Sequence, residues 1–598
     1  MMIINDTHLG RMIHDRIKMY GERIALRYRE DGIWKEISWN SMGDRIRAVS
    51  KGLVKMGVKE GDMVALFSQN RPEWTITDYG IMAIRGVSVP IYPTNTAKQT
   101  QYIIDETEAG IIFAGSQDQY DKVVSFFDGS PCLKKIIVFD DNVRLHDGGK
   151  SIYFKDFIDM GRKSDGDQEL ERRLKEASLE DLATIIYTSG TTGEPKGAML
   201  HHSTFYYSSL AHMKRLDTSD QDVSMCFLPL SHVFERAWCF LASSRGMVIN
   251  YCDDTSKIIE YMQEVKPTVM CAVPRFYEKM YSAVFEKLET APPSKKKLFL
   301  WAVRVGKQVY LKKKEKENLP FDLKLKHLIA DRLVLKKIRD VVGGRIRFFP
   351  CAGAQLSKEI EEFFHSVGLF ITYGYGLTET AATVTCHERY HFRPGTVGKP
   401  IDGVQVKIAE NGEILVKGET ITKGYYKKPE ATAESFENGW FKTGDVGILA
   451  DGYLTITDRI KDLMKSSGGK YVAPQLVETT IGKDHYIEQI AVIGDARKFV
   501  SALIVPAFNV LEDYARTHHI SYSSLEDLIQ NHRIIEFYQS RIAEHSKELV
   551  GHEQIKKFTL LSTPFTQEAG EMTPTMKIRR KFINEKYRDV IDRMYREK

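Results

Sequence analysis

Short apolar runs alternate with helix-like stretches between residues 60 and 140. The runs are Met63–Phe67, Val87–Tyr92, Ile111–Ala114 and Lys135–Phe139. Each has the length of a strand buried on both faces, and Trp74–Ile84, between the first two, has the length of a helix. Strands that alternate with helices predict a sheet of mainly parallel strands with helical crossovers, the pattern of an α/β protein.

The same alternation resumes after residue 200. Ser203 can cap a helix that continues to about Arg215. Further strands are predicted at Met225–Leu228, Met247–Tyr251, Thr268–Val273 and Ile346–Pro350. Together the two stretches predict a large N-terminal domain of parallel and mixed sheets flanked by helices.

The pattern changes near residue 398. Short strands are predicted at Val404–Ala409, Glu413–Val416 and Tyr453–Thr457. Asn-Gly and Asp-Gly dipeptides separate them and favour hairpin turns, so we expect a small distorted β-barrel over residues 398–458. Beyond it, the strand-like runs Ile490–Ile493 and Ala502–Val505 and the helical stretch Ile534–Val550 predict a small α+β C-terminal domain.

Composition narrows the class of protein. With 598 residues, 42% hydrophobic and 28% charged, the chain is expected to form two to four globular domains. A net charge of +5 is weak for so large a surface and argues against a nucleic-acid partner. The seven cysteines form no Cys-x-x-Cys pair, so we expect reduced thiols rather than zinc sites or disulfides.

The N-terminus lacks the pattern of a secretory signal, and no apolar run approaches the roughly 18 residues of a membrane span. We therefore expect a cytoplasmic protein whose contact with a membrane, at its inner face, could only be peripheral. Residues 279–337 are helical in pattern and rich in lysine. They are interpreted either as a solvated helix surface or as a surface that attracts an anionic membrane or the phosphates of coenzyme A; the sequence does not decide between these.

The segment Tyr187–Gly197 combines hydroxyl side chains, glycines and one lysine between two apolar runs. Glycines let successive N–H groups converge on one anion, and Lys196 adds a compact positive charge. The spacing is not that of the common P-loop. The segment predicts a strand, a polyphosphate-binding loop and a second strand.

A second candidate segment is Tyr373–Thr380, which follows the apolar run Leu369–Ile371. Its glycines allow backbone and tyrosine ring to approach a flat ligand closely. A carboxylate such as Glu379 repels a polyphosphate unless a metal lies between them, so Glu379 is the candidate ligand for Mg²⁺.

These two segments resemble motifs of the adenylate-forming superfamily, which contains acyl-CoA synthetases, peptide-synthetase adenylation domains and firefly luciferase. They and the further matching segments follow one another in the order of that superfamily. Four further segments match: Ala352–Leu356, Trp440–Asp445, Ser466–Lys470 and Thr573–Lys577. In the first, Ala352 and Gln355 depart from the usual glycine and proline. The resemblance covers about residues 15 to 582. Leu228–Arg236, with its Phe-Glu-Arg ending, and Gly343–Arg347 are similar to the long-chain fatty acyl-CoA synthetases in particular.

The resemblance implies a set of ATP or AMP contacts. They are Thr188, Ser189, Gly190, Thr191, Thr192, Gly193, Lys196, Gly353, Ala354, Tyr375, Gly376, Asp445 and Arg459. Tyr375 is expected to stack on adenine and Asp445 to accept both ribose hydroxyls. Thr378 is expected to contact the α-phosphate, and Glu379 the metal.

The remaining implied roles concern catalysis and movement. Lys577 is the expected catalytic lysine, because a cation that bridges two anions stabilises the attack of a carboxylate on a phosphate. His232 is expected beside the acyl carboxylate. Lys461, within residues 459–461, is the expected hinge between an N-terminal domain of residues 1–458 and a mobile C-terminal domain of residues 462–598. The loop carrying Ser467, Gly468, Gly469 and Lys470 is expected to face the nucleotide after rotation.

The implied activity has two steps: a fatty acid and Mg-ATP give acyl-AMP and pyrophosphate, and coenzyme A then displaces AMP. Three alternatives stay open: transfer to a carrier protein, a nucleotide-binding sensor without catalysis, and luciferase-like oxidation. Acyl chain length, oligomeric state and membrane attachment are not encoded in any motif.

Overall fold

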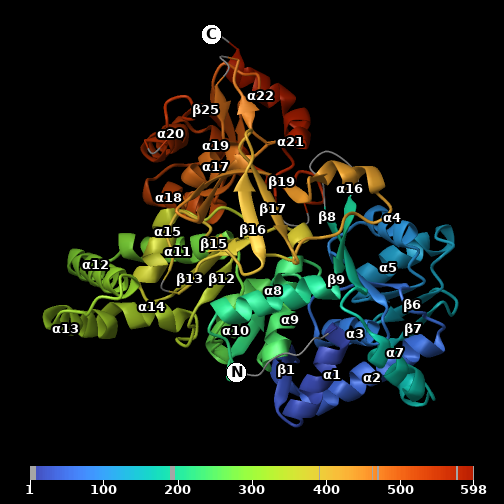
Figure 1. Ribbon diagram of the computed structural model, residues 1–598. Helices are drawn as coiled ribbons and strands as arrows, with labels where there is room; N and C mark the ends of the chain where they lie inside the picture. The colour runs from blue at the N-terminus through green and yellow to red at the C-terminus, as the bar shows by residue number, and fades with distance from the viewer. Residues whose placement is uncertain are drawn as a thin grey trace.

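A computed structural model describes residues 8–188, 195–389, 391–460, 462–467, 470–547, 549–573 and 577–596. Figure 1 shows sheets and helices of the N-terminal two thirds forming a broad base, with the C-terminal part above it. Both parts combine helices with sheets, as the sequence predicts, and the α/β class with a smaller α+β C-terminal part is confirmed.

The largest sheet has seven strands in the order β7-β6-β5-β3-β4-β8-β9. Their bounds are β3 Met63–Phe67, β4 Val87–Ile91, β5 Ile111–Ala114, β6 Lys135–Val138, β7 Ser151–Tyr153, β8 Leu182–Thr188 and β9 Lys196–His201. All neighbours are parallel except β8 and β9. Helices on this sheet and next to it are α1 Leu9–Tyr20, α2 Trp39–Lys55, α3 Pro72–Ala83, α4 Ala97–Thr107, α5 Gln117–Phe126, α6 Phe154–Arg162 and α7 Asp167–Glu176.

A second sheet has the order β10-β11-β1-β2, and a third the order β12-β13-β14-β15. The strands are β1 Ile24–Glu30, β2 Ile33–Ser38, β10 Val223–Cys226, β11 Val248–Tyr251, β12 Phe349–Cys351, β13 Ile371–Tyr375, β14 Thr385–Cys386 and β15 Lys399–Pro400. Helices α8 His202–Arg215, α9 Val233–Arg245, α10 Ile258–Val265 and α15 Lys358–Ser366 connect them. The glycine-rich segments therefore sit at strand ends, where ligands bind in open sheets.

The antiparallel unit contains β16 Val404–Ile408, β17 Glu413–Gly418, β18 Phe436–Glu437, β19 Trp440–Ala450 and β20 Tyr453–Arg459, with α16 Pro429–Ser435 between β17 and β18. These strands form a five-stranded sheet. β15 lies against both β16 and β20, which gives a barrel-like unit without a continuous hydrogen-bonded ring.

The C-terminal part forms its own apolar cores, whose members all lie between Met464 and Met594. Its strands are β21 Met464–Lys465, β22 Tyr471–Val472, β23 Ile487–Ile493, β24 Val500–Pro506 and β25 Ile555–Leu560, the last three forming one sheet. Its helices are α17 Pro474–Gly482, α18 Phe508–Thr517, α19 Leu525–Gln530, α20 His532–Ser546, α21 Arg580–Lys586 and α22 Arg588–Tyr595.

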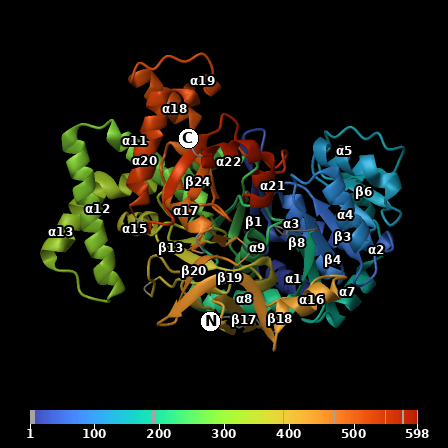
Figure 2. The same ribbon diagram turned by 90° about the horizontal axis from the view of Figure 1, so that it is seen from above.

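The lysine-rich section is helical, as predicted. It contains α11 Pro274–Glu289, α12 Pro293–Lys314, α13 Phe321–Ala330, a π-helical turn η3 Asp331–Leu335 and α14 Lys336–Val341. Figures 1 and 2 both place α12 and α13 at the outer edge of the molecule. No helix among the described residues combines the length and apolar character needed to cross a bilayer.

Several predicted elements differ from the structure. The strands predicted at Met225–Leu228 and Ile346–Pro350 lie at Val223–Cys226 and Phe349–Cys351. Helix α8 begins after His201, not after Ser203, because the Thr204 hydroxyl accepts the His201 N–H while the Ser203 N–H is bonded to Leu179 O. The run Thr268–Val273 forms isolated bridges through Val269 and Ala272 instead of a full strand. The apolar side chains from Val269 to Ala272 are buried, but the backbone pairs with its neighbours at single positions only.

Candidate functional site

A cavity of about 1710 Å³ lies between the N-terminal part and the C-terminal part. Strands of four sheets, the start of α9 and the segment before α21 contribute to its wall. Twelve of the predicted site residues line it: Thr188, Lys196, His232, Gly353, Ala354, Tyr375, Gly376, Thr378, Glu379, Asp445, Arg459 and Lys577. Residues from position 188 to position 577 thus meet around one space.

The ends of the glycine-rich loop are held by the β8–β9 ladder, in which Thr188 pairs with Lys196. The Thr188 hydroxyl donates to Lys196 O at 3.3 Å. The Lys196 ammonium lies 5.3 Å from the centre of the Tyr425 ring. The tip of the loop, with Ser189, Gly190, Thr191, Thr192 and Gly193, lies outside the described residues. The ladder therefore fixes where the Lys196 ammonium lies in the cavity wall.

Asp445 is the centre of a small hydrogen-bonded group. The Tyr375 hydroxyl donates to Asp445 Oδ2 at 2.6 Å, and Arg459 Nε lies 3.3 Å from Asp445 Oδ1. Burial raises the pKa of Asp445, and Arg459 opposes that rise. β19 and β20 supply this pair because Asp445 and Arg459 are directly opposite in the antiparallel ladder.

Glu379 lies in the short helix Thr378–Thr380 and is buried. Tyr425 donates its hydroxyl to Glu379 Oε1 at 2.8 Å, and burial raises the pKa of this carboxyl. The carboxylate shares the cavity wall with the hydroxyls of Thr188 and Thr378. A set of hard oxygen donors fits Mg²⁺.

The Gly353–Ala354 turn is fixed by a tyrosine. Gly353 has φ +97°, a backbone conformation that favours glycine. The Tyr373 hydroxyl donates to Ala354 O and accepts the Leu356 N–H, both at 2.9 Å. Gly376 has no room for a side chain, because a Cβ there would lie 2.0 Å from Ala382 O. Both departures from the family pattern, at 352 and 355, leave this turn in the cavity wall.

His232 caps helix α9, and its Nδ1 accepts the Phe234 N–H at 3.1 Å. Burial, with a smaller contribution from Lys577, lowers its pKa to about 4, so the ring is neutral at physiological pH. Since Nδ1 is an acceptor, Nε2 carries the proton. His232 can therefore offer a ligand in the cavity one N–H donor.

Lys577 enters the cavity from the C-terminal part. The residue is exposed and lines the cavity, but the surrounding protein and the nearby Arg459 lower the pKa of its ammonium to about 8. Asp445, Asp462 and Glu379 act in the opposite direction. The lysine is thus a cation placed among the groups that the sequence assigns to the nucleotide.

The other predicted residues of the C-terminal part are elsewhere. Ser467 and Lys470 are exposed near the β21–β22 hairpin and do not line the cavity; the Ser467 N–H donates to Arg497 O at 2.9 Å. Gly468, Gly469 and Lys461 lie outside the described residues. Among the described residues, the structure thus brings the predicted nucleotide residues together, while Ser467 and Lys470 lie outside the cavity.

Comparisons with known proteins agree with this geometry. A family model described as AMP-binding enzyme matches residues 13–426, and one described as AMP-binding enzyme C-terminal domain matches residues 461–598. The chain belongs to the AMP-binding enzyme family. It is 34% identical to the long-chain-fatty-acid–CoA ligase FadD15 of Mycobacterium bovis, covering 94% of this chain and 93% of that protein.

Two further relatives are informative. The peroxisomal long chain acyl-CoA synthetase 7 of Arabidopsis thaliana is 30% identical, covering 98% of this chain and 86% of its own. The crystal structure of the adenylation domain of a carboxylate reductase from Mycobacterium chelonae has a TM-score of 0.78 at 23% identity, covering 99% of this chain and 92% of its own. The structural likeness shows that this AMP-binding enzyme has the adenylate-forming fold.

Two tyrosines that support the site of this AMP-binding enzyme have no role assigned by the sequence motifs. Tyr425 connects Glu379 with Lys196, and Tyr373 fixes the Gly353–Ala354 turn. Tyr373 lies inside a motif, but the signal for Tyr425 is only an aromatic pair after Gly424. Its contact with Glu379 joins residues 46 positions apart.

The Phe-Glu-Arg segment after His232 has a structural position. Arg236 is buried and pairs with Asp78 through Nε at 3.1 Å and Nη2 at 2.5 Å, and its Nη1 donates to Thr184 Oγ1 at 2.6 Å. This two-point ion pair ties helix α9 to helix α3 and strand β8. It thereby sets the position of His232 at the start of α9.

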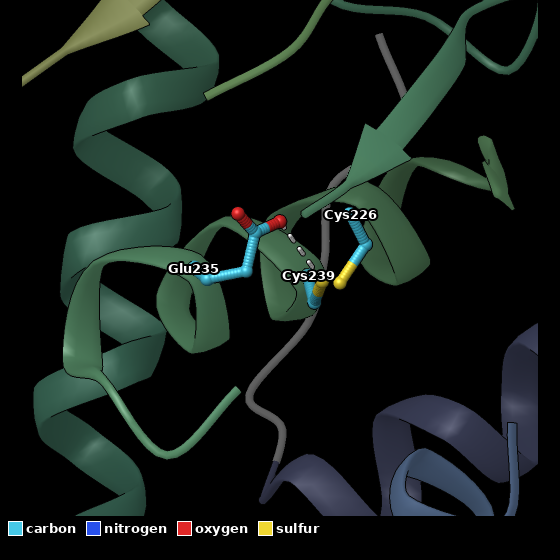
Figure 3. A group of neighbouring side chains, drawn as sticks. All are labelled: Cys226, Glu235 and Cys239. Atoms are coloured by element: carbon cyan, nitrogen blue, oxygen red, sulfur yellow. Dashed lines mark hydrogen bonds between the residues drawn. The ribbon is translucent and has the colours of Figure 1, made fainter. Parts of the chain in front are cut away.

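Glu235 forms a buried cluster with Cys226 and Cys239, whose ligand-type atoms lie within 4.8 Å of one another (Figure 3). Burial raises the pKa of Glu235 to about 8 and that of the Cys226 thiol well above its usual range. The Leu228 N–H and the Cys239 thiol both donate to Glu235. We interpret the cluster as neutral, hydrogen-bonded groups of the core, since three anions together would need a bound cation.

Proposed function

We propose that this AMP-binding enzyme is a long-chain-fatty-acid–CoA ligase that uses a fatty acid, ATP and coenzyme A as substrates. Relatives that carry this activity in their names align over nearly the whole chain. The observation that carries the proposal is the cavity in which Lys577, Glu379, Asp445 and Arg459 meet. A carboxylate is a poor electrophile, and such a site makes it reactive by joining it to AMP.

In the first step, a carboxylate oxygen of the acid attacks the α-phosphorus of ATP, and the bond to the β-phosphate oxygen breaks. Lys577 offsets the charge where the two anions meet. Lys196 and the loop from Thr188 hold the pyrophosphate that leaves. His232 donates its Nε2–H to the acyl group, Tyr375 lies against adenine, and Asp445 accepts the ribose hydroxyls.

Glu379 would hold Mg²⁺ together with phosphate oxygens, and Thr188 and Thr378 line the same cavity. The bound ion would neutralise part of the polyphosphate charge. The Tyr425 hydroxyl keeps the carboxylate oriented toward the cavity wall. Without a cation, a buried Glu379 is drawn toward its protonated form, as its raised pKa indicates.

In the second step, the sulfur of coenzyme A attacks the acyl carbon, and the carbon–oxygen bond to AMP breaks. We assign the change from the first step to the second to a rotation of residues 462–598 against residues 1–458. The rotation takes place about Lys461, in the hinge of residues 459–461. The rotation removes Lys577 and brings in the Ser467–Lys470 loop. The exposed positions of Ser467 and Lys470 outside the cavity support this assignment, since another arrangement is needed for them to reach it.

The decisive experiment is ATP–pyrophosphate exchange with carboxylic acids of graded chain length, followed by thioester formation with coenzyme A. Exchange that rises with chain length, and acyl-CoA formed without any carrier protein, are the expected results. Exchange without acyl-CoA would favour transfer to a carrier protein. Absence of exchange with every acid would overturn the proposal.

A further inference from the structure

Helix α13 and its continuation through η3 to α14 expose large apolar side chains at the edge of the molecule. Phe321 is 83% exposed and Leu328 66% exposed, and Leu325, Ile329 and Leu333 are also exposed. Figures 1 and 2 show α13 on the outer side of α12, away from the sheets. Positions 321, 325 and 328 follow the helical period and share one face.

The opposite face of the same helix is already used for packing. Leu323, Ala330 and Leu335 are buried in a core that includes Val305 and Val309 of α12. The helix thus has two apolar faces, of which only one is covered by residues that the structure describes. An uncovered set of large apolar side chains marks a surface for interaction.

Positive charge is concentrated in the section of the chain that carries the exposed face. Residues 291–341 contain 15 basic and five acidic residues, a net charge of +10, while the whole chain carries only +5. Lys326 and Lys336 pair with Asp322 and Asp340 on their own helix. The basic side chains Lys324, Arg332 and Lys337 form no ion pair with any residue that the structure describes.

We propose that the face of Phe321, Leu325 and Leu328, with Lys324, Arg332 and Lys337 around it, docks on an anionic lipid bilayer. The apolar side chains enter the boundary between headgroups and acyl chains, and the cations contact lipid phosphates. A second copy of the chain is disfavoured as the occupant, because it would bring two strongly positive sections of residues 291–341 together. The helix lies on the membrane and does not cross it.

Lipid docking does not depend on the proposed enzymatic function, but that function gives it a use. Long-chain fatty acids partition into bilayers, so an enzyme held at the surface meets them at high local concentration. The two ideas can fail separately. Membrane binding is measured without substrates, and adenylation of a short acid is measured without membrane.

Flotation of the full-length protein with vesicles tests the proposal. The vesicles contain either phosphatidylcholine alone or equal parts of phosphatidylcholine and phosphatidylglycerol. The parent protein is expected to float with the anionic vesicles and to lose binding as salt rises. Phe321→Ser with Leu328→Ser, and separately Lys324→Glu with Lys337→Glu, should each weaken binding at least tenfold. All four positions are exposed, so these variants keep the packing of the fold.

Matched controls separate surface chemistry from location. Ile33→Ser replaces an apolar residue that is 62% exposed elsewhere, and Lys417→Glu reverses an exposed lysine of β17. Both should bind vesicles like the parent. Equal losses in the controls, or no flotation of the parent, would overturn the proposal. The proposal would also be overturned if the parent protein formed an oligomer in lipid-free solution and Phe321→Ser with Leu328→Ser dissociated it. A raised KM for coenzyme A as the defect of the charge-reversed variant would overturn it as well.

Discussion

The two walls of the cavity are built in different ways. The N-terminal wall is braced by buried contacts, in which Tyr375 donates to Asp445 and Tyr425 to Glu379. The C-terminal wall approaches it through contacts of largely exposed polar groups, such as Arg275 with Glu488 and Gln567 with Thr94 O. The difference teaches that the proposed binding groups are held by buried contacts, while Lys577 is carried by a part that has apolar cores of its own.

The sharpest test of this contrast is Lys577→Ala. Loss of a cation at the reacting phosphate should reduce acyl-adenylate formation by about 10²- to 10³-fold. Thioester formation from supplied acyl-AMP should change little, because the proposed rotation has by then moved Lys577 out of the site. Stopped-flow or quenched assays of the two half-reactions measure both. Equal losses in the two would show that Lys577 does not belong to one arrangement only.

The reverse pattern is expected for Lys461→Pro. A proline restricts the backbone at the hinge and should trap the first arrangement. Adenylate formation should persist, while thioester formation falls by at least tenfold. Lys461→Ala, which keeps the backbone free, is the matched control. Normal turnover of coenzyme A in the proline variant would show that rotation about Lys461 is not required for thioester formation.

The pH profile of adenylation reports the charge of Lys577. Its pKa of about 8 means that the ammonium is present below that pH and is lost above it. For adenylation, kcat/KM, which reports the free enzyme, should therefore fall up to about tenfold per unit as pH rises past 8. In Lys577→Arg the guanidinium stays protonated, so whatever activity remains should lack this fall. A profile shared by both proteins would assign the titration to another group.

A smaller effect is expected from Tyr425→Phe, which removes the hydroxyl bonded to Glu379 but keeps the ring beside Lys196. A hydrogen bond to a charged group contributes on the order of 1.5 kcal/mol, so KM for Mg-ATP should rise about tenfold. Tyr425→Leu removes the ring as well and should be worse. Magnesium titration of pyrophosphate exchange measures both variants. An unchanged KM in Tyr425→Phe would separate this tyrosine from the metal site.

The smallest effect on activity is expected for Glu235→Gln, which concerns the rigidity of the N-terminal wall. Burial raises the pKa of Glu235 from 4.5 to about 8. Between these values the unfolded chain releases the proton and the folded chain keeps it, so the free energy of unfolding falls as pH rises. The glutamine variant lacks this penalty. Its Tm advantage should grow between about pH 5.5 and about pH 7.5, and a constant difference would contradict the pKa.

Parts of the fold follow directly from local pattern. Met63–Phe67 and Ile111–Ala114 are strands with the predicted bounds, because short apolar runs between turns have few alternatives. Thr268–Val273 shows the limit, since burial of apolar side chains does not specify backbone pairing. The start of α8 was wrong by two residues because Thr204, not Ser203, satisfies the backbone of His201.

The candidate site was predictable for a different reason. Its residues lie in ordered motifs, and the structure brings twelve of them to one cavity, although their individual roles stay predictions. What the sequence could not supply were contacts between distant segments, such as Tyr425 with Glu379 or Arg236 with Asp78. Burial, which decides whether Glu235 is charged, depends on packing that no single motif encodes.

The uneven charge of the chain also affects its orientation as it approaches a charged surface. Because residues 291–341 carry +10 and the whole chain +5, the remaining residues carry −5. The molecule is therefore an electric dipole, and a negatively charged surface exerts a torque on it before any contact forms. Within a Debye length of about 8 Å, that torque turns residues 291–341 toward the negatively charged surface and the acidic remainder of the molecule away from it.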